Sequence, residues 1–306
     1  MRIAVTGATG FLGRYIVARL AGAGHHCVCW HRPTSDLGHF DVPKGALTWI
    51  PGSLEEGKSA DDLVDRCEAV VHAALERPGG GFIGSEGDLV PFVEANVVGT
   101  LRLIEAARRA GVQRFVSIST CAVYDVILGD RPLDEAHPLW PKSHYGAHKA
   151  ALEAFVHSYG LGHGFPICAL RPTGIYGLAH PPRKSKWYDL IAAVARGEDV
   201  EARRGGKEVH AADVAHAVEL LLGADAKAIA GQSFNCCDRY TSEYEVATIA
   251  KAMTGSLGAI HGETPTPKHQ IDTSKIHTLG MRFGGLPLLE RTIEAILETL
   301  RTTGPS

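Results

Sequence analysis

Short apolar runs alternate with longer amphipathic stretches along most of the chain. Periodicity and residue type predict that the apolar runs are β-strands. They cover residues 2–6, 26–31, 46–50, 69–73, 113–119, 166–171 and 233–236. Helical spacing of apolar residues predicts helices near 11–23, 60–66, 88–111, 145–161, 187–196, 211–224 and 242–254. Strands separated by helices favour an α/β protein with a parallel, doubly wound sheet.

The alternation loosens beyond residue 172, where Pro181-Pro182, Gly205-Gly206 and two further prolines divide the pattern into short pieces. We therefore expect a larger domain over residues 1–172 and a smaller C-terminal region over 173–306. Segments near 205–236 are expected to return to the sheet of the larger domain.

A glycine-rich turn joins the first predicted strand to the first predicted helix. It reads Thr6-Gly7-Ala8-Thr9-Gly10-Phe11-Leu12-Gly13. Glycines let the backbone approach a diphosphate closely, and a helix N-terminus offers free N–H groups and positive potential. The spacing is G-x-x-G-x-x-G, not the commoner G-x-G-x-x-G. The turn predicts a dinucleotide bound by a Rossmann domain, and the alternative is a purely structural turn.

The second predicted strand ends in Cys29-Trp30-His31-Arg32-Pro33. A carboxylate at this place would accept a hydrogen bond from the ribose 2′-hydroxyl and would repel a 2′-phosphate. The sequence instead offers Arg32, a cation suited to a phosphate, and Asp36 follows four residues later. We therefore expect NADP to be favoured over NAD, although Arg32 could also stack on the adenine.

Tyr145 and Lys149 open a predicted helix and lie four residues apart, on one helix face. A nearby ammonium favours the phenolate of tyrosine, which could then exchange a proton with a substrate alcohol. Alone, this pair could be an ordinary surface pair. His148, between the two, is expected to point away from their face.

Hydroxyl side chains end the fifth predicted strand, in Ser117-Ile118-Ser119-Thr120. Ligands of doubly wound sheets bind outside the carboxyl ends of the strands, where a hydroxyl could hold the reacting oxygen. Asn96 lies within a helical pattern. It is either a buried amide bonded to backbone or a residue that holds water behind the lysine.

Together these motifs resemble the extended short-chain dehydrogenase/reductases, in particular the NAD-dependent epimerase/dehydratase family, which acts largely on nucleotide sugars. The resemblance covers residues 1 to about 290 in family order. It rests on TGATGFLG, His72-Ala73-Ala74, Asn96-Val97-Val98-Gly99-Thr100, SISTCAVY, YGAHK, RPTGIYG and His210-Ala211-Ala212-Asp213.

The resemblance implies catalytic roles for Thr120, Tyr145, Lys149 and Asn96. Expected cofactor contacts are Gly7, Thr9, Gly10, Phe11, Leu12, Arg32, Ser53, Leu54, Ala73, Ala74, Asn96, Ser119, Tyr145, Lys149, Arg171, Pro172 and Thr173. Expected substrate contacts are Thr120, Cys121, Tyr145, Arg183 and Lys268.

Two departures from the family pattern bear on the substrate. Dehydratases carry an acidic pair after the catalytic threonine, whereas this chain has Cys121-Ala122, so we do not expect sugar dehydration. Arginines that clamp the substrate diphosphate are missing from their usual places, one of which aligns with Gly206. Cations near 183–186 or Lys268 are candidates to replace them.

The leading interpretation is an NAD(P)-dependent oxidoreductase or epimerase that transfers hydride at a secondary alcohol or ketone of a sugar-like substrate, with nucleotide sugars among the candidates. The first alternative is a dehydrogenase or reductase of a free sugar, lactone or hydroxyketone. An alternative of another class is a non-catalytic NADP-binding regulator.

Composition narrows the partners of this 306-residue chain. The net charge of −3 offers no basic excess for nucleic acid, and no apolar run approaches the ~18 residues that would span a bilayer. The seven cysteines form no paired CxxC units and the 16 histidines no ligand set, so we expect no metal. We expect a cytoplasmic protein. The family resemblance implies a homodimer that pairs the 88–111 and 145–161 helices, with apolar surface from Leu101, Leu103, Ile104, Phe155 and Val156, although the same residues could instead face the sheet.

Overall fold

The computed structural model describes residues 1–77, 84 and 86–303. The run Pro78-Gly79-Gly80-Gly81, whose composition predicts a loop after the fourth strand, lies outside them. The chain divides into two compact units. The larger unit contains Met1–Pro172, Val214–Cys236 and Ile271–Met281. The smaller unit contains Thr173–Asp213, Cys237–Gln270 and the chain from Arg282 onward. The segments of the C-terminal half that belong to the larger unit are thus 214–236 and 271–281.

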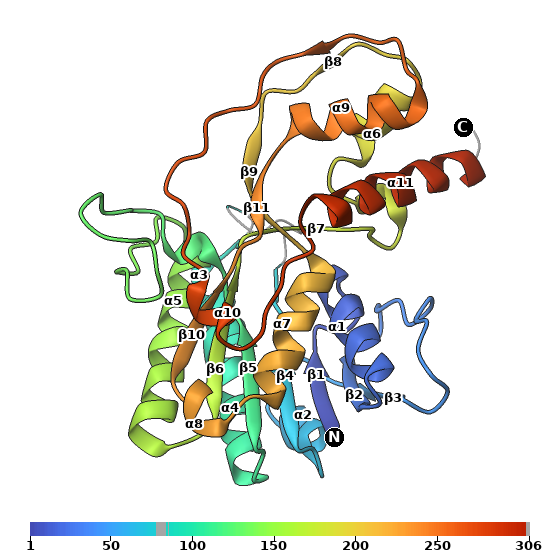
Figure 1. Ribbon diagram of the computed structural model, residues 1–306. Coiled ribbons are helices and arrows are strands. Elements are labelled where there is room, and N and C mark those ends of the chain that lie inside the picture. The colour runs from blue at the N-terminus through green and yellow to red at the C-terminus, as the bar shows by residue number, and fades with distance from the viewer. Residues whose placement is uncertain (78–83, 85, 304–306) are drawn as a thin grey trace. The chain divides into compact units, whose positions relative to one another are not determined.

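The larger unit is built on a seven-stranded sheet whose strand order is β10-β6-β5-β4-β1-β2-β3 (Figure 1). Every neighbouring pair is parallel, so the expected doubly wound parallel sheet is confirmed. The strands are β1 (Arg2–Thr6), β2 (His26–His31), β3 (Leu47–Pro51), β4 (Ala69–His72), β5 (Arg114–Ile118), β6 (Ile167–Pro172) and β10 (Gln232–Cys236).

Helices flank this sheet, and two of the predicted helices contain a widened π turn. The helices are α1 (Phe11–Gly22), α2 (Ser59–Val64), α3 (Leu89–Val93), α4 (Gly99–Arg109), α5 (His144–His157), α8 (Ala226–Ile229) and α10 (Ser274–His277), with the 3₁₀ turn η2 (Cys121–Val123). The π turns are η1 (Glu94–Val98), between α3 and α4, and η3 (Ser158–Gly162), after α5. Helix α7 (Ala211–Gly223) begins in the smaller unit and continues into the larger.

The core of the larger unit forms because its strands are apolar on both faces, as a sheet covered by helices on both sides requires. Leu103 and Ile104 of α4 and Val156 of α5 are buried in this core. Three of the five residues expected at a dimer interface therefore face the sheet instead. Phe155, by contrast, is 40% exposed.

The smaller unit has a three-stranded sheet of order β11-β9-β7, formed by β7 (Gly174–Tyr176), β9 (Gly205–His210) and β11 (Arg239–Ser242). A second, parallel pair joins β8 (Val200–Glu201) to β12 (Ile260–His261). Its helices are η4 (Pro182–Lys184), α6 (Tyr188–Ala195), α9 (Glu243–Thr254) and α11 (Gly285–Thr303). Apolar residues of α6, α9 and α11 pack with Tyr176 of β7 into one core.

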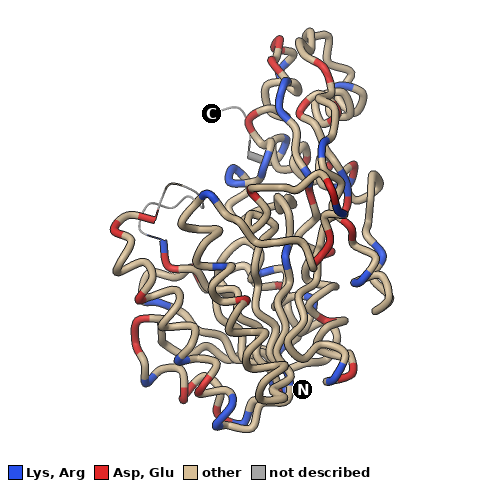
Figure 2. Tube along the Cα trace, turned by 90° about the vertical axis from the view of Figure 1, so that its left-hand side faces the viewer, with Lys and Arg blue, Asp and Glu red and all other residues tan. Residues whose placement is uncertain are grey.

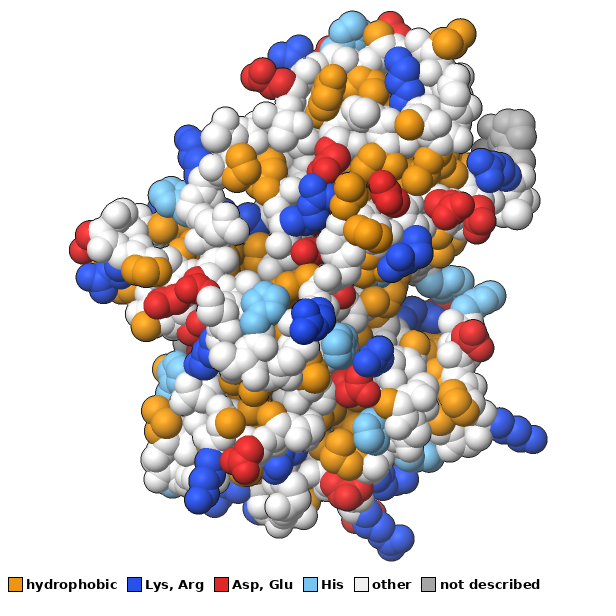
Figure 3. Space-filling model, viewed as in Figure 1, with side chains coloured by type: hydrophobic (Ala, Val, Ile, Leu, Met, Phe, Trp, Pro, Cys, Tyr) orange, Lys and Arg blue, Asp and Glu red, His pale blue; other side chains and the backbone are white. Residues whose placement is uncertain are grey.

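Charge is mixed over the described chain. Figure 2 shows basic and acidic residues interspersed along the trace, and on the face in Figure 3 both signs lie among apolar side chains. None of the described helices is long and apolar enough to cross a membrane. The residues that can be described also contain no cluster of His, Cys, Asp and Glu suited to a metal ion.

Candidate active site

The glycine turn after β1 leaves no room for a side chain at Gly7 or Gly13. Gly7 has a φ of +71°, and a Cβ on it would lie 2.6 Å from the backbone of Ala73. A Cβ on Gly13 would lie 2.0 Å from the carbonyl oxygen of Gly7. Helix α1 starts here with no capping side chain among the described residues and no acid in its first turn. Its first N–H groups therefore suit the diphosphate of a dinucleotide, and Thr9, Gly10, Phe11 and Leu12 lie at the same helix start.

A buried chain of hydrogen bonds fixes the loop after β4 beside this turn. The N–H of Ala74 donates to Oγ1 of Thr6 over 3.1 Å. The imidazole of His72 lies 2.8 Å from that oxygen through Nδ1 and 2.9 Å from Oγ1 of Thr100 through Nε2. Thr100 donates to the carbonyl of Asn96 over 2.6 Å. Burial lowers the pKa of His72 to about 3, so the ring is neutral near pH 7.

Asn96 lies in the π turn η1, is 2% exposed and continues this chain. Its Oδ1 accepts the N–H of Glu76 over 2.8 Å, and its Nδ2 donates to the carbonyls of Glu76 and Phe92, each over 2.9 Å. These are the contacts of the backbone-bonded amide that the sequence offered as one alternative. A role in holding water stays a prediction.

Helix α5 places the tyrosine and the lysine. Ser143 caps the helix, accepting the N–H of Gly146 over 3.1 Å. Tyr145 and Lys149 are 8% and 6% exposed. The Nζ of Lys149 donates to the carbonyl of Ile118, the last residue of β5, over 2.8 Å. Burial lowers the pKa of Lys149 to about 8, against the attraction of the nearby Glu153 carboxylate.

The hydroxyl of Thr120 lies close enough to the phenol of Tyr145 to influence its ionisation, so two of the predicted catalytic groups lie together. Burial raises the pKa of Tyr145, while the Thr120 hydroxyl and the positive charge of Arg77 act to lower it. Sequence reasoning expected Lys149 to supply that charge and missed Arg77. Its place, shortly after His72-Ala73-Ala74 at a strand end, was the available signal.

His148 was expected to point away from the helix face of Tyr145 and Lys149, but its ring lies against that of Tyr145. Its ring lies 5.3 Å from the ring of Tyr145 and 5.0 Å from that of Phe92, measured between centroids. Residues three apart on a helix share a face, which explains the contact with Tyr145. Burial, followed by the charge of Lys149, lowers the pKa of His148 to about 3.

The groups expected at the adenosine end follow β2 and β3. The guanidinium of Arg32 is paired with the carboxylate of Glu76, with Nη1 and Oε2 2.8 Å apart. The cation expected to bind a 2′-phosphate is therefore already paired with a carboxylate. Ser53 and Leu54 follow β3, and Leu54 is buried, with its carbonyl so close to Gly99 that a Cβ there would approach it to 2.4 Å.

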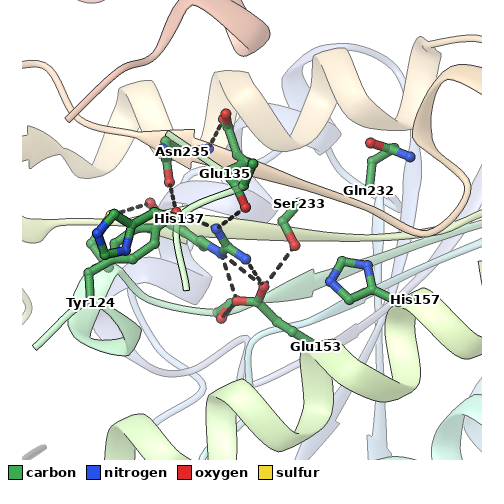
Figure 4. A network of polar contacts seen from close by, with 12 residues as sticks. Tyr124, Glu135, His137, Glu153, His157, Gln232, Ser233 and Asn235 are labelled. Atoms are coloured by element: carbon green, nitrogen blue, oxygen red, sulfur yellow. Dashed lines mark hydrogen bonds and ion pairs between the residues drawn. The ribbon is translucent and has the colours of Figure 1, made fainter. Parts of the chain in front are cut away.

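Arg171 does not offer its side chain to a cofactor, contrary to expectation. It is 1% exposed, and its Nε donates to both carboxylate oxygens of Glu153, over 3.0 and 2.9 Å. Ser119 also donates to Glu153, and Ser233 does so over 2.7 Å. Figure 4 shows Glu153 at the centre of this network. The side chain of Arg171 is thus engaged within the fold, and Thr173 belongs to the smaller unit.

Within the smaller unit, a cavity of about 430 Å³ opens between residues of α6, β9, β11 and α9. Lys186 lines it and is paired with Glu208, with Nζ and Oε1 2.5 Å apart. Arg204, also in the wall, is paired with Glu243 over 3.0 Å. Arg183 and Lys268, which we expected to contact substrate, are exposed and do not line this cavity. Cys121 lies in the larger unit, where its Sγ donates to the carbonyl of Arg171 over 3.1 Å.

The fold and the groups at its strand ends define a dinucleotide-binding α/β protein with a tyrosine–lysine pair. The sequence model of the NAD dependent epimerase/dehydratase family matches residues 3–237, and the chain belongs to this family.

Curated relatives include both glycan-biosynthesis and dehydratase proteins. The low-salt glycan biosynthesis protein Agl12 of Haloferax volcanii is 32% identical over 68% of this chain and 67% of that protein. A dTDP-glucose 4,6-dehydratase of Streptomyces antibioticus is 34% identical, and the alignment covers 60% of this chain but only 56% of the dehydratase. The expectation that this chain is no dehydratase is therefore not confirmed by its relatives.

Solved structures bear on the fold. The crystal structure of a UDP-glucose 4-epimerase of Thermus thermophilus in complex with NAD has a TM-score of 0.77 with 24% identity. The match covers 98% of this chain and 100% of that one. At this identity the likeness shows a shared architecture over the whole described chain.

Proposed function

We propose that the protein catalyses hydride transfer at a secondary alcohol or ketone of a sugar-like substrate, using a nicotinamide dinucleotide. The observation that carries the proposal is that Thr120 and Tyr145 lie together near the carboxyl end of β5, where Lys149 donates to the carbonyl of Ile118. The family, which is NAD dependent, and the fit of the glycine turn to a diphosphate support the cofactor. When bound, the nicotinamide supplies the hydride acceptor or donor.

The chain's own residues would handle the proton and the oxygen. Thr120 would hold the reacting oxygen beside Tyr145, whose phenol would take up or return the proton of the alcohol. Because burial raises the pKa of Tyr145, the phenol is protonated before a ligand enters. Arg77 and the ammonium of Lys149 are the cations whose charge would then favour its ionisation.

Nucleotide sugars are the substrate class that the relatives favour, since one of them is a dTDP-glucose 4,6-dehydratase. We propose epimerisation or net oxidation rather than dehydration. The side chains after Thr120 are Cys121 and Ala122, neither of which can protonate a leaving hydroxyl as a carboxylic acid does. A net dehydrogenase would release its reduced cofactor, whereas an epimerase would retain it.

The test is a thermal-shift screen of nucleotide sugars against free sugars and lactones, with NAD or NADP present, followed by turnover of any hit. Tyr145→Phe removes the proton donor but keeps the ring, and should reduce turnover by about 10²–10⁴-fold. Tyr159→Phe is the matched control, because Tyr159 lies in the π turn η3 after α5 and its hydroxyl donates to Glu105 of α4. Undiminished turnover of Tyr145→Phe would reject the mechanism in favour of a cofactor-binding regulator.

We also retain a homodimer as a proposal. Phe155 of α5 and Val98 of η1 are 40% and 38% exposed, which leaves apolar surface on the helices expected to pair. Phe155→Glu should shift a dimer toward monomer in analytical ultracentrifugation, and an unchanged sedimentation coefficient would place the interface elsewhere or show that none exists.

A further inference from the structure

The ion pair of Arg32 and Glu76 lies where the ribose end of a dinucleotide is recognised. Arg32 directly follows β2, and Glu76 lies in the loop after β4. Their side chains are 56% and 30% exposed. An exposed ion pair of this kind contributes little to stability, so its significance lies in its position at the end of β2, where the ribose of a dinucleotide is recognised.

The end of β2 itself supplies no acid to the ribose. Asp36 is the next carboxylate along the chain, and it is engaged in shaping its own loop. Its Oδ1 accepts the N–H of Gly38 over 2.9 Å, and its Oδ2 lies 3.4 Å from Nη2 of Arg14. Arg14 also donates to the carbonyl of Gly38 over 2.7 Å, which ties this loop to helix α1.

Glu76, in contrast, is held in position by a buried group. Asn96 binds both the N–H and the carbonyl of Glu76, and Thr100 binds the carbonyl of Asn96. The backbone of Glu76 is thus held by buried hydrogen bonds, while its carboxylate oxygen Oε2 contacts Arg32 at the surface. A fixed charge discriminates between ligands better than a mobile one, because it cannot relax away from a repulsive group.

We propose that Glu76 is the specificity-determining residue for the cofactor and that it selects NAD over NADP. It does so in two ways: it neutralises Arg32, and it places a negative charge where a 2′-phosphate would have to bind. A 2′-phosphate would need to displace the carboxylate from the guanidinium, whereas a 2′-hydroxyl could donate to it. This inference rests on the proposed dinucleotide site and reverses the NADP preference drawn from Arg32 alone.

The test is isothermal titration of NAD and NADP, without substrate, into the wild type, Glu76→Gln, Arg32→Gln and the double variant. Glu76→Gln frees Arg32 and removes the repulsion, so NADP should bind at least about tenfold tighter while NAD changes little. The double variant should lose that gain, because the cation that binds the phosphate is gone. Arg32→Gln alone should leave the preference for NAD in place.

Glu219→Gln is the matched control, because Glu219 forms an Arg–Glu pair of the same larger unit, with Nε of Arg19 2.5 Å from its Oε2 and side-chain exposures of 47% and 25%. It should change neither dissociation constant. Thermal unfolding of each variant checks that the fold is kept.

Two results would separate this inference from the function on which it rests. If the wild type binds NAD but Glu76→Gln leaves the ratio of the two dissociation constants unchanged, or if the wild type already prefers NADP, the role of Glu76 is refuted and the proposed function stands. If neither dinucleotide binds the wild type, the proposed function fails and the inference fails with it.

Discussion

Two buried carboxylates, one in each unit, differ in how completely the surrounding groups satisfy their hydrogen bonds. Glu153 in the larger unit is 1% exposed and accepts bonds from Arg171, Ser119 and Ser233. Glu208 in the smaller unit is 4% exposed, and Lys186 binds its Oε1, but its Oε2 has no hydrogen-bond partner within the described part of the chain. Burial raises the pKa of Glu208 despite the nearby lysine.

Structural polar groups can be separated from functional ones by how completely their hydrogen bonds are satisfied. A fully bonded buried ion joins elements of a fold, here β6, β10, α5 and the residue that follows β5, and has no capacity left for a ligand. A buried acid with an unmet acceptor in the wall of a cavity keeps that capacity. The RPTGIYG motif was expected to bind cofactor, yet its arginine belongs to the first kind.

The largest effect should come from breaking the bonded pair. Glu153→Gln leaves the Arg171 charge buried without its counter-ion, and the free energy of unfolding should fall by about 3–5 kcal/mol in chemical denaturation. Replacing both residues by methionine should recover most of the loss, because no charge then stays buried. Glu198→Gln, in an exposed pair with Arg196, is the control. A loss no larger than the control's would remove the distinction between the two carboxylates.

An intermediate effect should come from His148, whose two ring nitrogens are buried without a hydrogen-bond partner among the described residues. Its pKa is lowered to about 3, so the unfolded chain binds a proton that the folded chain refuses, and stability falls as the pH drops below about 6.5. His148→Phe should remove about 2 kcal/mol of the destabilisation that develops between pH 7 and pH 5.

Unfolding curves at the two pH values measure this difference. The exposed His144, on the same helix, provides a His144→Phe control that should not alter the pH dependence. Identical pH dependence of His148→Phe and the wild type would mean that the ring of His148 is hydrated or bonded in solution.

The smallest change in stability should follow Glu208→Gln. The amide is cheaper to bury than a carboxylate, and the lost attraction to the 37% exposed Lys186 is screened by water, so the net change should stay under about 1 kcal/mol. Denaturation at neutral pH measures it. A loss as large as that of Glu153→Gln would make Glu208 a structural ion like Glu153.

The larger unit was predictable because its signals are local and periodic. Strands such as β1 and β2 have continuously apolar centres, and the expected ranges match them to the residue. In the smaller unit the predicted helices near 187–196 and 242–254 match α6 and α9. The strands β7, β8 and β12 were not predicted, because they have two or three residues and are defined by their partners. Helix α11 was missed because Gly284-Gly285 and Pro287 resemble a break, although proline is tolerated in a first turn.

The site divides in the same way. The glycine turn and the Tyr145–Lys149 pair each lie within a few residues of the chain, so both could be predicted from the sequence. The partners of Arg32, Arg171 and Lys186 lie 44, 18 and 22 residues away along the chain. Motifs therefore locate such side chains, and only the three-dimensional structure shows whether their charges are still available.

The hydrogen bonds around the imidazole of His72 all run in one direction. Thr100 donates its single hydroxyl proton to Asn96, so it can only accept from His72, and the proton of the neutral ring must sit on Nε2. Nδ1 is then bare and takes the hydroxyl proton of Thr6, whose oxygen receives the N–H of Ala74. Every donor points from the loop toward the helix, so the ring is locked in one tautomer, which the ¹⁵N shifts of its two nitrogens would reveal.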